Sequence, residues 1–366
     1  MGKLHDLHNA GQSVWLDFIR RDMLGNGDLE SQVADGIRGL TSNPSIFKNA
    51  IGASELYDPA IREAIAADPS IPAIGVYEGL AVADIQAAAD ALLGVYSSSN
   101  GDDGYVSLEV SPRLAADTDG TVAEAHRLWA LVDRPNLMIK VPATPEGIPA
   151  VEELIAAGLN VNATLMFSLA DYEAVAQAYV RGIRRSEEPS KIASVASFFV
   201  SRVDNNMDAA LDKIGSPAAL EQRGRAAVAN AKLAYARYRE IFEGPLFADQ
   251  LERGARPQRP LWASTSTKNP SYSDVLYVEP LIGPNTVNTM PPATIDAFLD
   301  HGGIDASALD TDVAGAQRDI DALAELGVDY DAITSTLQVD GVRSFADAFE
   351  DLLDTVNDKM ERLRQP

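Results

Sequence analysis

The sequence predicts an α/β protein folded as a single (β/α)8 TIM barrel with additional C-terminal helices. Short apolar segments rich in β-branched residues alternate with longer segments of helical periodicity, a pattern typical of a parallel sheet covered by helices. The short segments number about eight, the number of strands that closes a barrel. Because the connections are short and barrels often exceed the usual domain size, we expect residues 1–366 to form one domain.

The expected strands are short, and helical segments separate most of them. In chain order they cover residues 14–19, 39–43, 105–110, 137–141, 161–167, 192–201, 261–266 and 286–289. The most polar connection, SSSNGDDG at 97–104, is rich in residues that favour turns and precedes the third strand.

Apolar residues three and four positions apart mark the connecting helices. These are expected at residues 58–66, 79–95, 121–132, 150–157, 169–185 and, as one long helix, 219–242. Three further helical segments follow the last strand, at 292–301, 313–326 and 344–363. We expect them to form a helical cap against the barrel over about residues 292–366.

Composition excludes several classes of function. Acidic residues outnumber basic ones by 54 to 30, so the net charge of −24 disfavours nucleic acid and anionic lipid as partners. A phosphate substrate would therefore need a local cluster of donors. The absence of cysteine removes disulfides and thiolate catalysis. With no signal peptide and no apolar run near the roughly 20 residues that span a bilayer, the sequence indicates a cytoplasmic protein.

No motif indicates a metal or a cofactor. The four histidines are scattered, and His5 and His8 are expected in a mobile terminus without further ligands. Neither a GxGxxG turn after a strand nor a Walker loop is present, so dinucleotide and nucleotide binding are unsupported. The sequence therefore predicts a site without a bound metal, dinucleotide or nucleotide.

Polar residues at the strand ends indicate where that chemistry lies. Residues two apart on a strand share a face, and the C-terminal ends of barrel strands converge on one pocket. A single serine or threonine there is more often a turn former, but several strands end in the same way. The residues concerned are Thr41 and Asn43; Ser107 and Glu109; Asn162 and Thr164; and Ser264, Ser266 and Lys268.

Lys140 is the most unusual of the charged residues because it stands in the apolar run LMIKVP. Burial disfavours the ammonium form and frees the amine to attack a carbonyl. A structural ion pair, or a side chain that reaches along the strand to water, explains the position equally well. Asp17 and Glu109 also stand in apolar strands, where they could move protons for Schiff-base chemistry or form a buried salt bridge with Lys140.

Six ordered motifs then carry a resemblance to a known family. They are WLDFIRR at 15–21, GLTSNPSIF at 39–47, VSLEVSPRLA at 106–115, LMIKVPAT at 137–144, GLNVNATLMFS at 158–168 and ASFFVSR at 196–202. With these motifs the chain resembles the transaldolase family over nearly its whole length, in the longer bacterial form. The resemblance implies a class I aldolase-like barrel without a cofactor.

The resemblance also implies catalytic roles. Lys140 would form the Schiff base, and Glu109, through a water held with Thr164, would shuttle protons while the imine forms and hydrolyses. Asp17 would take the C4 hydroxyl proton during cleavage of the C3–C4 bond and return one when the new bond forms.

Further residues would hold the substrate. Asn43, Asn162 and Ser197 would bind the dihydroxyacetone hydroxyls, with Thr41 and Ser107 orienting them.

At the phosphate end, Arg202 and Ser264 match the family's binding residues. The second arginine of shorter members is missing from ASTSTK at 263–268, so Lys268 or Ser266 would replace it.

The implied reaction belongs to the pentose phosphate pathway. A dihydroxyacetone unit passes from sedoheptulose 7-phosphate to glyceraldehyde 3-phosphate, giving erythrose 4-phosphate and fructose 6-phosphate. The nearest alternative is a fructose 6-phosphate aldolase, but such enzymes have glutamine and tyrosine where this chain has Glu109 and Phe199. A barrel that holds pyridoxal phosphate on Lys140, or a non-catalytic sugar-phosphate-binding barrel, remains open. We expect a monomer or a homodimer.

Overall fold

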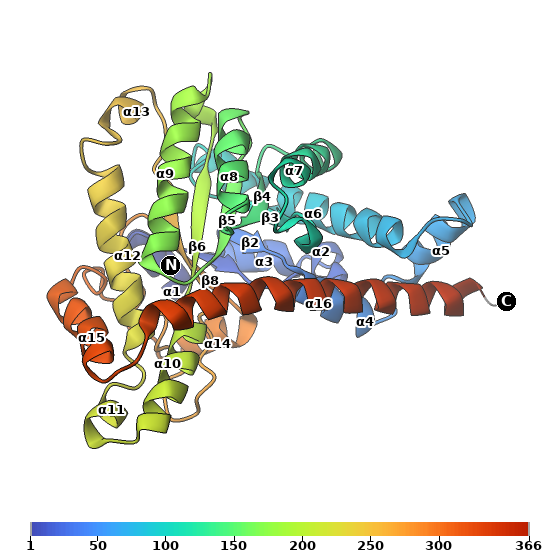
Figure 1. Cartoon of the computed structure of the whole chain (residues 1–366). Coiled ribbons are helices and arrows are strands. Elements are labelled where there is room, and N and C mark those ends of the chain that lie inside the picture. The colour runs from blue at the N-terminus through green and yellow to red at the C-terminus, as the bar shows by residue number, and fades with distance from the viewer. Residues whose placement is uncertain (1, 365–366) are drawn as a thin grey trace.

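A computed structural model describes residues 2–364 and confirms the predicted barrel (Figure 1). Eight parallel strands pair in chain order, and the eighth closes the sheet by pairing with the first. They are β1 (Gln12–Leu16), β2 (Gly39–Thr41), β3 (Val106–Glu109), β4 (Leu137–Pro142), β5 (Val161–Met166), β6 (Ser194–Phe199), β7 (Arg259–Ala263) and β8 (Thr286–Met290).

Each expected strand is present, although several end earlier than the sequence suggested. β1 stops at Leu16, β6 at Phe199 and β7 at Ala263, so the polar residues beyond them lie in loops or helix starts. Asn43 illustrates the cause, because its side chain accepts a hydrogen bond from the backbone amide of Ile46 and begins the next helix. The polar ends of the apolar segments therefore belong to strand-to-helix turns.

The helices surround the barrel and account for most of the remaining chain. They are α1 (Lys3–Asn9), α2 (Arg21–Gly25), α3 (Asp28–Asp35), α4 (Pro44–Gly52), α5 (Asp58–Ala67), α6 (Ala73–Ser98), α7 (Thr118–Val132), α8 (Gly147–Ala156), α9 (Leu169–Arg185), α10 (Ser201–Ile214), α11 (Pro217–Glu221), α12 (Ala226–Phe242), α13 (Ala248–Glu252), α14 (Pro292–His301), α15 (Val313–Glu325) and α16 (Tyr330–Arg364). Short 3₁₀ turns occur at Pro112–Leu114, Pro189–Lys191 and Glu279–Leu281.

Two helical predictions were wrong in extent, and one segment that was expected to be mobile is a helix. The single helix expected at 219–242 is divided into α11 and α12, because Gly224 between them has a φ of +72°, which does not continue a helix. The last helix begins at Tyr330 and not at residue 344. The N-terminal segment with His5 and His8 is the ordered helix α1, whose Leu4 and Leu7 are buried against the barrel.

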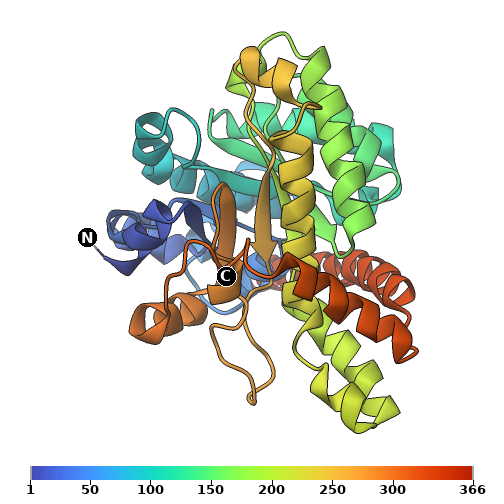
Figure 2. The same cartoon turned by 90° about the vertical axis from the view of Figure 1, so that its left-hand side faces the viewer.

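The last three helices lie on different parts of the barrel. α14 follows β8, and α15 packs on α12 (Figure 2). α16 is one continuous helix of 35 residues that runs past α4, α5 and α6 (Figure 1). That residues 1–366 form one domain with a C-terminal cap stays a prediction.

α6 contradicts the expectation that no segment is long and apolar enough to span a membrane. By length and composition alone it is apolar enough to cross a membrane, which the sequence analysis missed because alanines and glycines interrupt its large apolar residues. In the structure, 44% of its most apolar window is buried, and the helix packs against α3, α7 and β3. These contacts are those of a core helix in a folded barrel.

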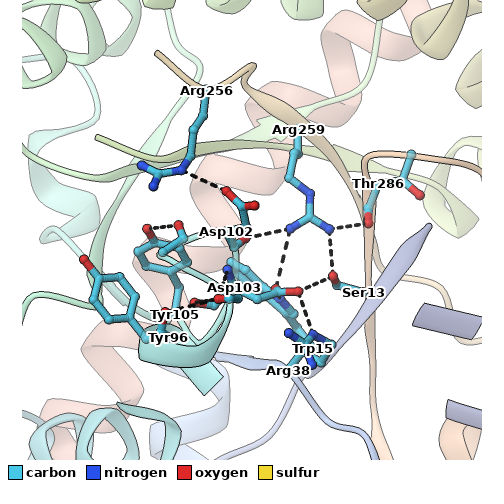
Figure 3. A network of polar contacts seen from close by, with 12 residues as sticks. Ser13, Trp15, Arg38, Tyr96, Asp102, Asp103, Tyr105, Arg256, Arg259 and Thr286 are labelled. Atoms are coloured by element: carbon cyan, nitrogen blue, oxygen red, sulfur yellow. Dashed lines mark hydrogen bonds and ion pairs between the residues drawn. The ribbon is translucent and has the colours of Figure 1, made fainter. Parts of the chain in front are cut away.

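The N-terminal ends of the strands are held together by a buried polar network (Figure 3). Asp103, just before β3, accepts hydrogen bonds from Trp15 Nε1 at 2.8 Å, Arg38 Nε at 2.9 Å and the Ser13 hydroxyl. Arg259 of β7 lies 3.5 Å from the same carboxylate and donates to the Ser13 hydroxyl at 2.7 Å. The buried Asp103 carboxylate is thus compensated by groups on or beside three other strands, β1, β2 and β7.

Candidate active site

A cavity of about 520 Å³ lies at the opposite, C-terminal end of the strands, within the usual size range of small-molecule sites. Eleven of the residues singled out from the sequence line it: Asp17, Thr41, Asn43, Lys140, Thr164, Ser197, Phe199, Arg202, Ser264, Ser266 and Lys268. Glu109, Ser107 and Asn162 lie behind this wall. The barrel therefore brings side chains from β1 to β7 to one place.

Strand register sets the centre of the cavity. Glu109 of β3 pairs with Lys140 of β4, which in turn pairs with Asn162 of β5. Paired residues in adjacent strands point to the same face, so these three side chains form one layer inside the barrel. The register therefore places the Lys140 side chain inside the barrel, between those of Glu109 and Asn162.

The Lys140 amine is buried but loosely held. Its side chain is 7% exposed, and Nζ lies 3.5 Å from Glu109 Oε2 and 3.3 Å from the carbonyl oxygen of Ser42. Lys359, a second buried lysine, instead donates to Ser54 O at 2.6 Å and Asp58 Oδ1 at 2.9 Å. Short hydrogen bonds such as those of Lys359 are typical of a structural lysine. The contacts of Lys140 are longer, and they therefore favour a reactive amine over a structural ion pair.

The Glu109 carboxyl group is buried inside the barrel. Burial raises its pKa to about 7, although the Lys140 ammonium opposes the rise. Glu109 Oε2 and the buried Thr164 hydroxyl both lack a hydrogen-bond partner among the atoms of residues 2–364. A carboxyl group with a pKa near neutrality can both accept and donate a proton, as acid–base catalysis requires.

Backbone strain occurs beside Thr164. The following residue, Leu165, has a φ of +62°, and the pairing of β5 with β6 shifts register between Ala163 and Met166. A large side chain rarely adopts a positive φ, and such strain is common at functional sites. The irregular backbone changes the direction of β5 at its end, where Thr164 lines the cavity.

Asp17 stands at the end of β1 on another side of the cavity. Thr41 Oγ1 donates a hydrogen bond of 2.9 Å to its carboxylate, which fixes the orientation. Burial raises the pKa of Asp17, while Lys140 and Arg202 lower it to a smaller extent. A carboxylate of raised pKa is a stronger base than an exposed one.

Several amides and hydroxyls in this region bond to one another. The Asn162 side chain donates to Ser107 Oγ at 3.0 Å and accepts from Ser197 Oγ at 2.6 Å. Only Ser197 of these three lines the cavity, so Ser107 and Asn162 orient it from behind. Asn43 uses its carbonyl oxygen to cap α4, which leaves its amide hydrogens for a ligand.

The far end of the cavity is cationic. Arg202 lies in the first turn of α10, with its guanidinium 5.2 Å from the centre of the Phe199 ring, and it forms no ion pair within residues 2–364. Ser264 lies beside it with a strained φ of +57° and contacts Ser201 Oγ at 3.0 Å. The exposed Lys268 stands at the rim. An unpaired arginine next to hydroxyls and a helix N-terminus suits a phosphate group.

The structure adds residues that the sequence analysis missed. Ser45 and Asn49 follow Asn43 on α4, and Asn205 follows Arg202 by three positions on α10. Helical spacing from Arg202 could have identified Asn205, whereas Ser45 and Asn49 lie two and six positions after Asn43 and share a face only with each other. Phe345 of α16 had no such signal, because an apolar residue in an amphipathic helix reads as core.

Comparison with known proteins gives a consistent result. The chain matches the family model described as Transaldolase/Fructose-6-phosphate aldolase over residues 14–356. It is 48% identical to a transaldolase of Frankia alni, with 98% of each chain covered, and 49% identical to one of Thiobacillus denitrificans, with 95% of this chain and 98% of the other covered. A transaldolase of Mycolicibacterium smegmatis is 46% identical, with 98% of each chain covered. The resemblance indicated by the six motifs is confirmed.

Proposed function

The chain belongs to the transaldolase/fructose-6-phosphate aldolase family and has the transaldolase function of its relatives, and we propose that Lys140 carries out this function through a Schiff base. The observation that carries the proposal is the buried, loosely held Lys140 amine beside Glu109, whose pKa is about 7. No metal or cofactor enters the proposed mechanism.

Imine formation is the first step. The Lys140 amine attacks the C2 carbonyl of a ketose phosphate, and Glu109 passes protons to and from the carbinolamine through a water held with Thr164. The pKa of about 7 allows Glu109 to protonate the leaving hydroxyl and then to recover the proton. The open hydrogen-bonding positions of Glu109 and Thr164 support this pairing.

Carbon–carbon cleavage is the second step. Asp17 takes the C4 hydroxyl proton, the C3–C4 bond breaks, and its electron pair moves into the protonated imine to give an enamine. Burial of Asp17 raises its pKa and so supports its role as base, while the Thr41 hydrogen bond holds it in place. Addition of the enamine to the acceptor aldehyde reverses these movements and gives the new ketose.

Substrate binding divides between the two sides of the cavity. We assign the dihydroxyacetone hydroxyls to Asn43 and Ser197, with Asn162 acting on Ser197 through the 2.6 Å hydrogen bond. Phe199 forms the apolar wall on which Arg202 rests.

We assign the phosphate to Arg202 and Ser264, supplemented by Lys268 from the rim. Charge attraction then guides a sugar phosphate into a protein that carries a net charge of −24.

In detail, the proposed reaction transfers dihydroxyacetone from sedoheptulose 7-phosphate to glyceraldehyde 3-phosphate, in the cytoplasm and within the pentose phosphate pathway. Fructose 6-phosphate aldolase activity is the second candidate, because the matching family model covers both enzymes. Glu109 and Phe199, in place of glutamine and tyrosine, favour the transferase.

A pair of assays tests the reaction. With fructose 6-phosphate and erythrose 4-phosphate together, we expect rapid formation of sedoheptulose 7-phosphate. With fructose 6-phosphate alone, we expect little free dihydroxyacetone. Release of dihydroxyacetone without acceptor at the rate of transfer would show an aldolase, and the absence of both reactions would leave a sugar-phosphate-binding barrel.

A further inference from the structure

The helix α16 is fixed across the C-terminal ends of the strands. Gln338 Nε2 donates to the carbonyl oxygens of Ala143 at 2.9 Å and Leu165 at 3.4 Å, at the ends of β4 and β5. One turn later Gly341 packs so closely that a Cβ atom there would lie 3.1 Å from the Leu165 side chain. The position of α16 relative to Lys140 is therefore set by direct contacts with the strand that carries Lys140 and with its neighbour.

The far half of the same helix is anchored separately. Lys359 Nζ donates to Asp58 Oδ1 at 2.9 Å, and Arg362 Nη2 donates to Asp58 Oδ2 at 2.6 Å. With contacts on both sides, the middle of α16 has little freedom to move along its axis. Phe345 lies in this middle portion.

Phe345 is the residue through which α16 reaches the candidate active site. Its side chain is buried and lines the cavity, and its ring centre lies 5.5 Å from Lys140 Nζ. Phe349, one turn further along α16, points elsewhere and packs edge-on against Tyr77 with ring centres 5.6 Å apart. Phe345 and Phe349 therefore have similar burial on one helix, but only Phe345 contacts the amine.

The chemistry of the proposed intermediate gives Phe345 a role. A three-carbon unit bound to Lys140 Nζ through its C2 carbon begins one bond length from that nitrogen, within reach of the ring. If a proton donor reaches the enamine carbon, the enamine becomes an iminium. Water then adds at C2, the C–N bond breaks, and free dihydroxyacetone leaves as the Lys140 amine is restored. Transfer requires that this sequence be slower than arrival of the acceptor.

An aromatic ring slows this side reaction in a specific way. It offers no acidic proton, and it occupies space next to the intermediate that water would otherwise fill. Both effects depend on the ring being beside Nζ, not on its contribution to packing.

We propose that Phe345 determines the partition of the Lys140-bound intermediate between transfer to an aldehyde and release as dihydroxyacetone. This inference rests on the Schiff base at Lys140 proposed above. It gives α16 a function in reaction specificity as well as in covering the barrel.

Three variants of the full chain, Phe345→Leu, Phe345→Met and Phe349→Leu, are compared with the unchanged protein. For each, the rate of dihydroxyacetone release from fructose 6-phosphate alone is divided by the rate of transfer to erythrose 4-phosphate. We expect Phe345→Leu and Phe345→Met to raise this ratio about tenfold. Phe349→Leu, which loosens the same helix without touching Lys140, leaves the ratio unchanged.

Borohydride trapping on Lys140, measured in parallel, separates the two proposals. If Lys140 is trapped in all variants and both Phe345 variants keep the original ratio, the role of Phe345 is wrong and the Schiff base stands. An equal rise in the Phe349→Leu variant would also overturn it, because the effect would then come from helix packing. If Lys140 is not trapped even in the unchanged protein, the proposed function fails and this inference with it.

Discussion

The two ends of the barrel both bury charged groups, but they treat them differently. At the N-terminal end, the Asp103 carboxylate is surrounded by Trp15, Arg38 and the Ser13 hydroxyl at hydrogen-bonding distance (Figure 3). At the C-terminal end, Lys140 and Glu109 are 3.5 Å apart, and Glu109 Oε2 has no hydrogen-bond partner in residues 2–364. A buried charge with a full set of partners supports the fold, whereas one without them costs stability.

The number of hydrogen-bond partners therefore distinguishes structural from reactive charged groups in this protein. In the N-terminal network, each of Ser13, Trp15, Arg38, Asp103 and Arg259 forms a hydrogen bond to another member. The incomplete C-terminal network has raised pKa values at Glu109 and Asp17 and strained backbone at Leu165 and Ser264. Substitutions at the C-terminal end should therefore affect the reaction rate, and those at the N-terminal end should affect the free energy of unfolding.

The largest expected effect on rate comes from Lys140→Met. Loss of the nucleophile should lower transfer by more than about a thousandfold. At pH 6, below the pKa of about 7 at Glu109, the neutral carboxyl group tolerates the loss of the amine, so the free energy of unfolding should not fall. Urea unfolding and the transfer assay measure the two quantities.

Lys359→Met is the matched control, because Lys359 is also a buried lysine but has short hydrogen bonds to Ser54 and Asp58. It should lose stability and keep its rate per folded molecule. The same outcome for Lys140→Met would mean that Lys140 is structural.

Glu109→Gln should have the next largest effect, a fall in rate of about 10²- to 10⁴-fold. The wild-type rate should change with pH around the Glu109 pKa of about 7, and this limb should be absent in the variant. Because the pKa is raised on folding, the favourable contribution of Glu109 to stability is present at low pH and is lost as the pH rises through about 7.

The glutamine variant should therefore gain stability relative to wild type above pH 7 and not below pH 4. Denaturation curves at several pH values measure this. A variant that keeps both the full rate and the pH limb would exclude Glu109 from proton transfer.

At the N-terminal end, Asp103→Ala should lower the free energy of unfolding by about 3–5 kcal/mol, since it leaves the partly buried Arg38 and Arg259 without their carboxylate. The rate per folded molecule should stay close to wild type. Asp102→Ala is the control: Asp102 is 70% exposed and pairs with Arg256 at 2.9 Å, so it should cost about 1 kcal/mol or less. A rate loss in Asp103→Ala without loss of stability would contradict the division between the two ends.

The smallest expected effect concerns the rim of the cavity. Lys268→Met should raise KM for sugar phosphates about five- to tenfold, with kcat changed by less than about twofold, because an exposed point charge adds modest binding energy. The effect should shrink as salt is added. Lys213→Met, at an exposed lysine in the last turn of α10, serves as the control. Equal KM values in the two variants would remove Lys268 from the phosphate site.

Much of the barrel could be predicted from the sequence because its rules are local. Alternation of apolar segments and helical periodicity identified all eight strands, and the spacing of two along strands placed Lys140, Glu109 and Asp17 near one another. Helix boundaries were less accurate, as Gly224 shows, since a positive φ is a property of the folded chain. The length of α16 was underestimated because its first half packs on the barrel through polar and small residues such as Gln338 and Gly341.

The rest depended on contacts between distant segments. Phe345 has an ordinary helical environment in sequence, and only the path of α16 across β4 and β5 places it beside Lys140. The strain at Leu165 and Ser264 is equally invisible, because neither residue type favours a positive φ. The difference between a complete and an incomplete network is likewise a matter of distances, which residue types alone do not give.

The central claim is that the incompletely partnered lysine at the C-terminal end is the nucleophile. Borohydride reduction in the presence of fructose 6-phosphate, followed by peptide mapping, tests it most directly. The account predicts one substrate-dependent adduct of a three-carbon unit on Lys140, and none on Lys359, the buried lysine with short hydrogen bonds. An adduct on another lysine, or active transfer with no adduct at all, would contradict it.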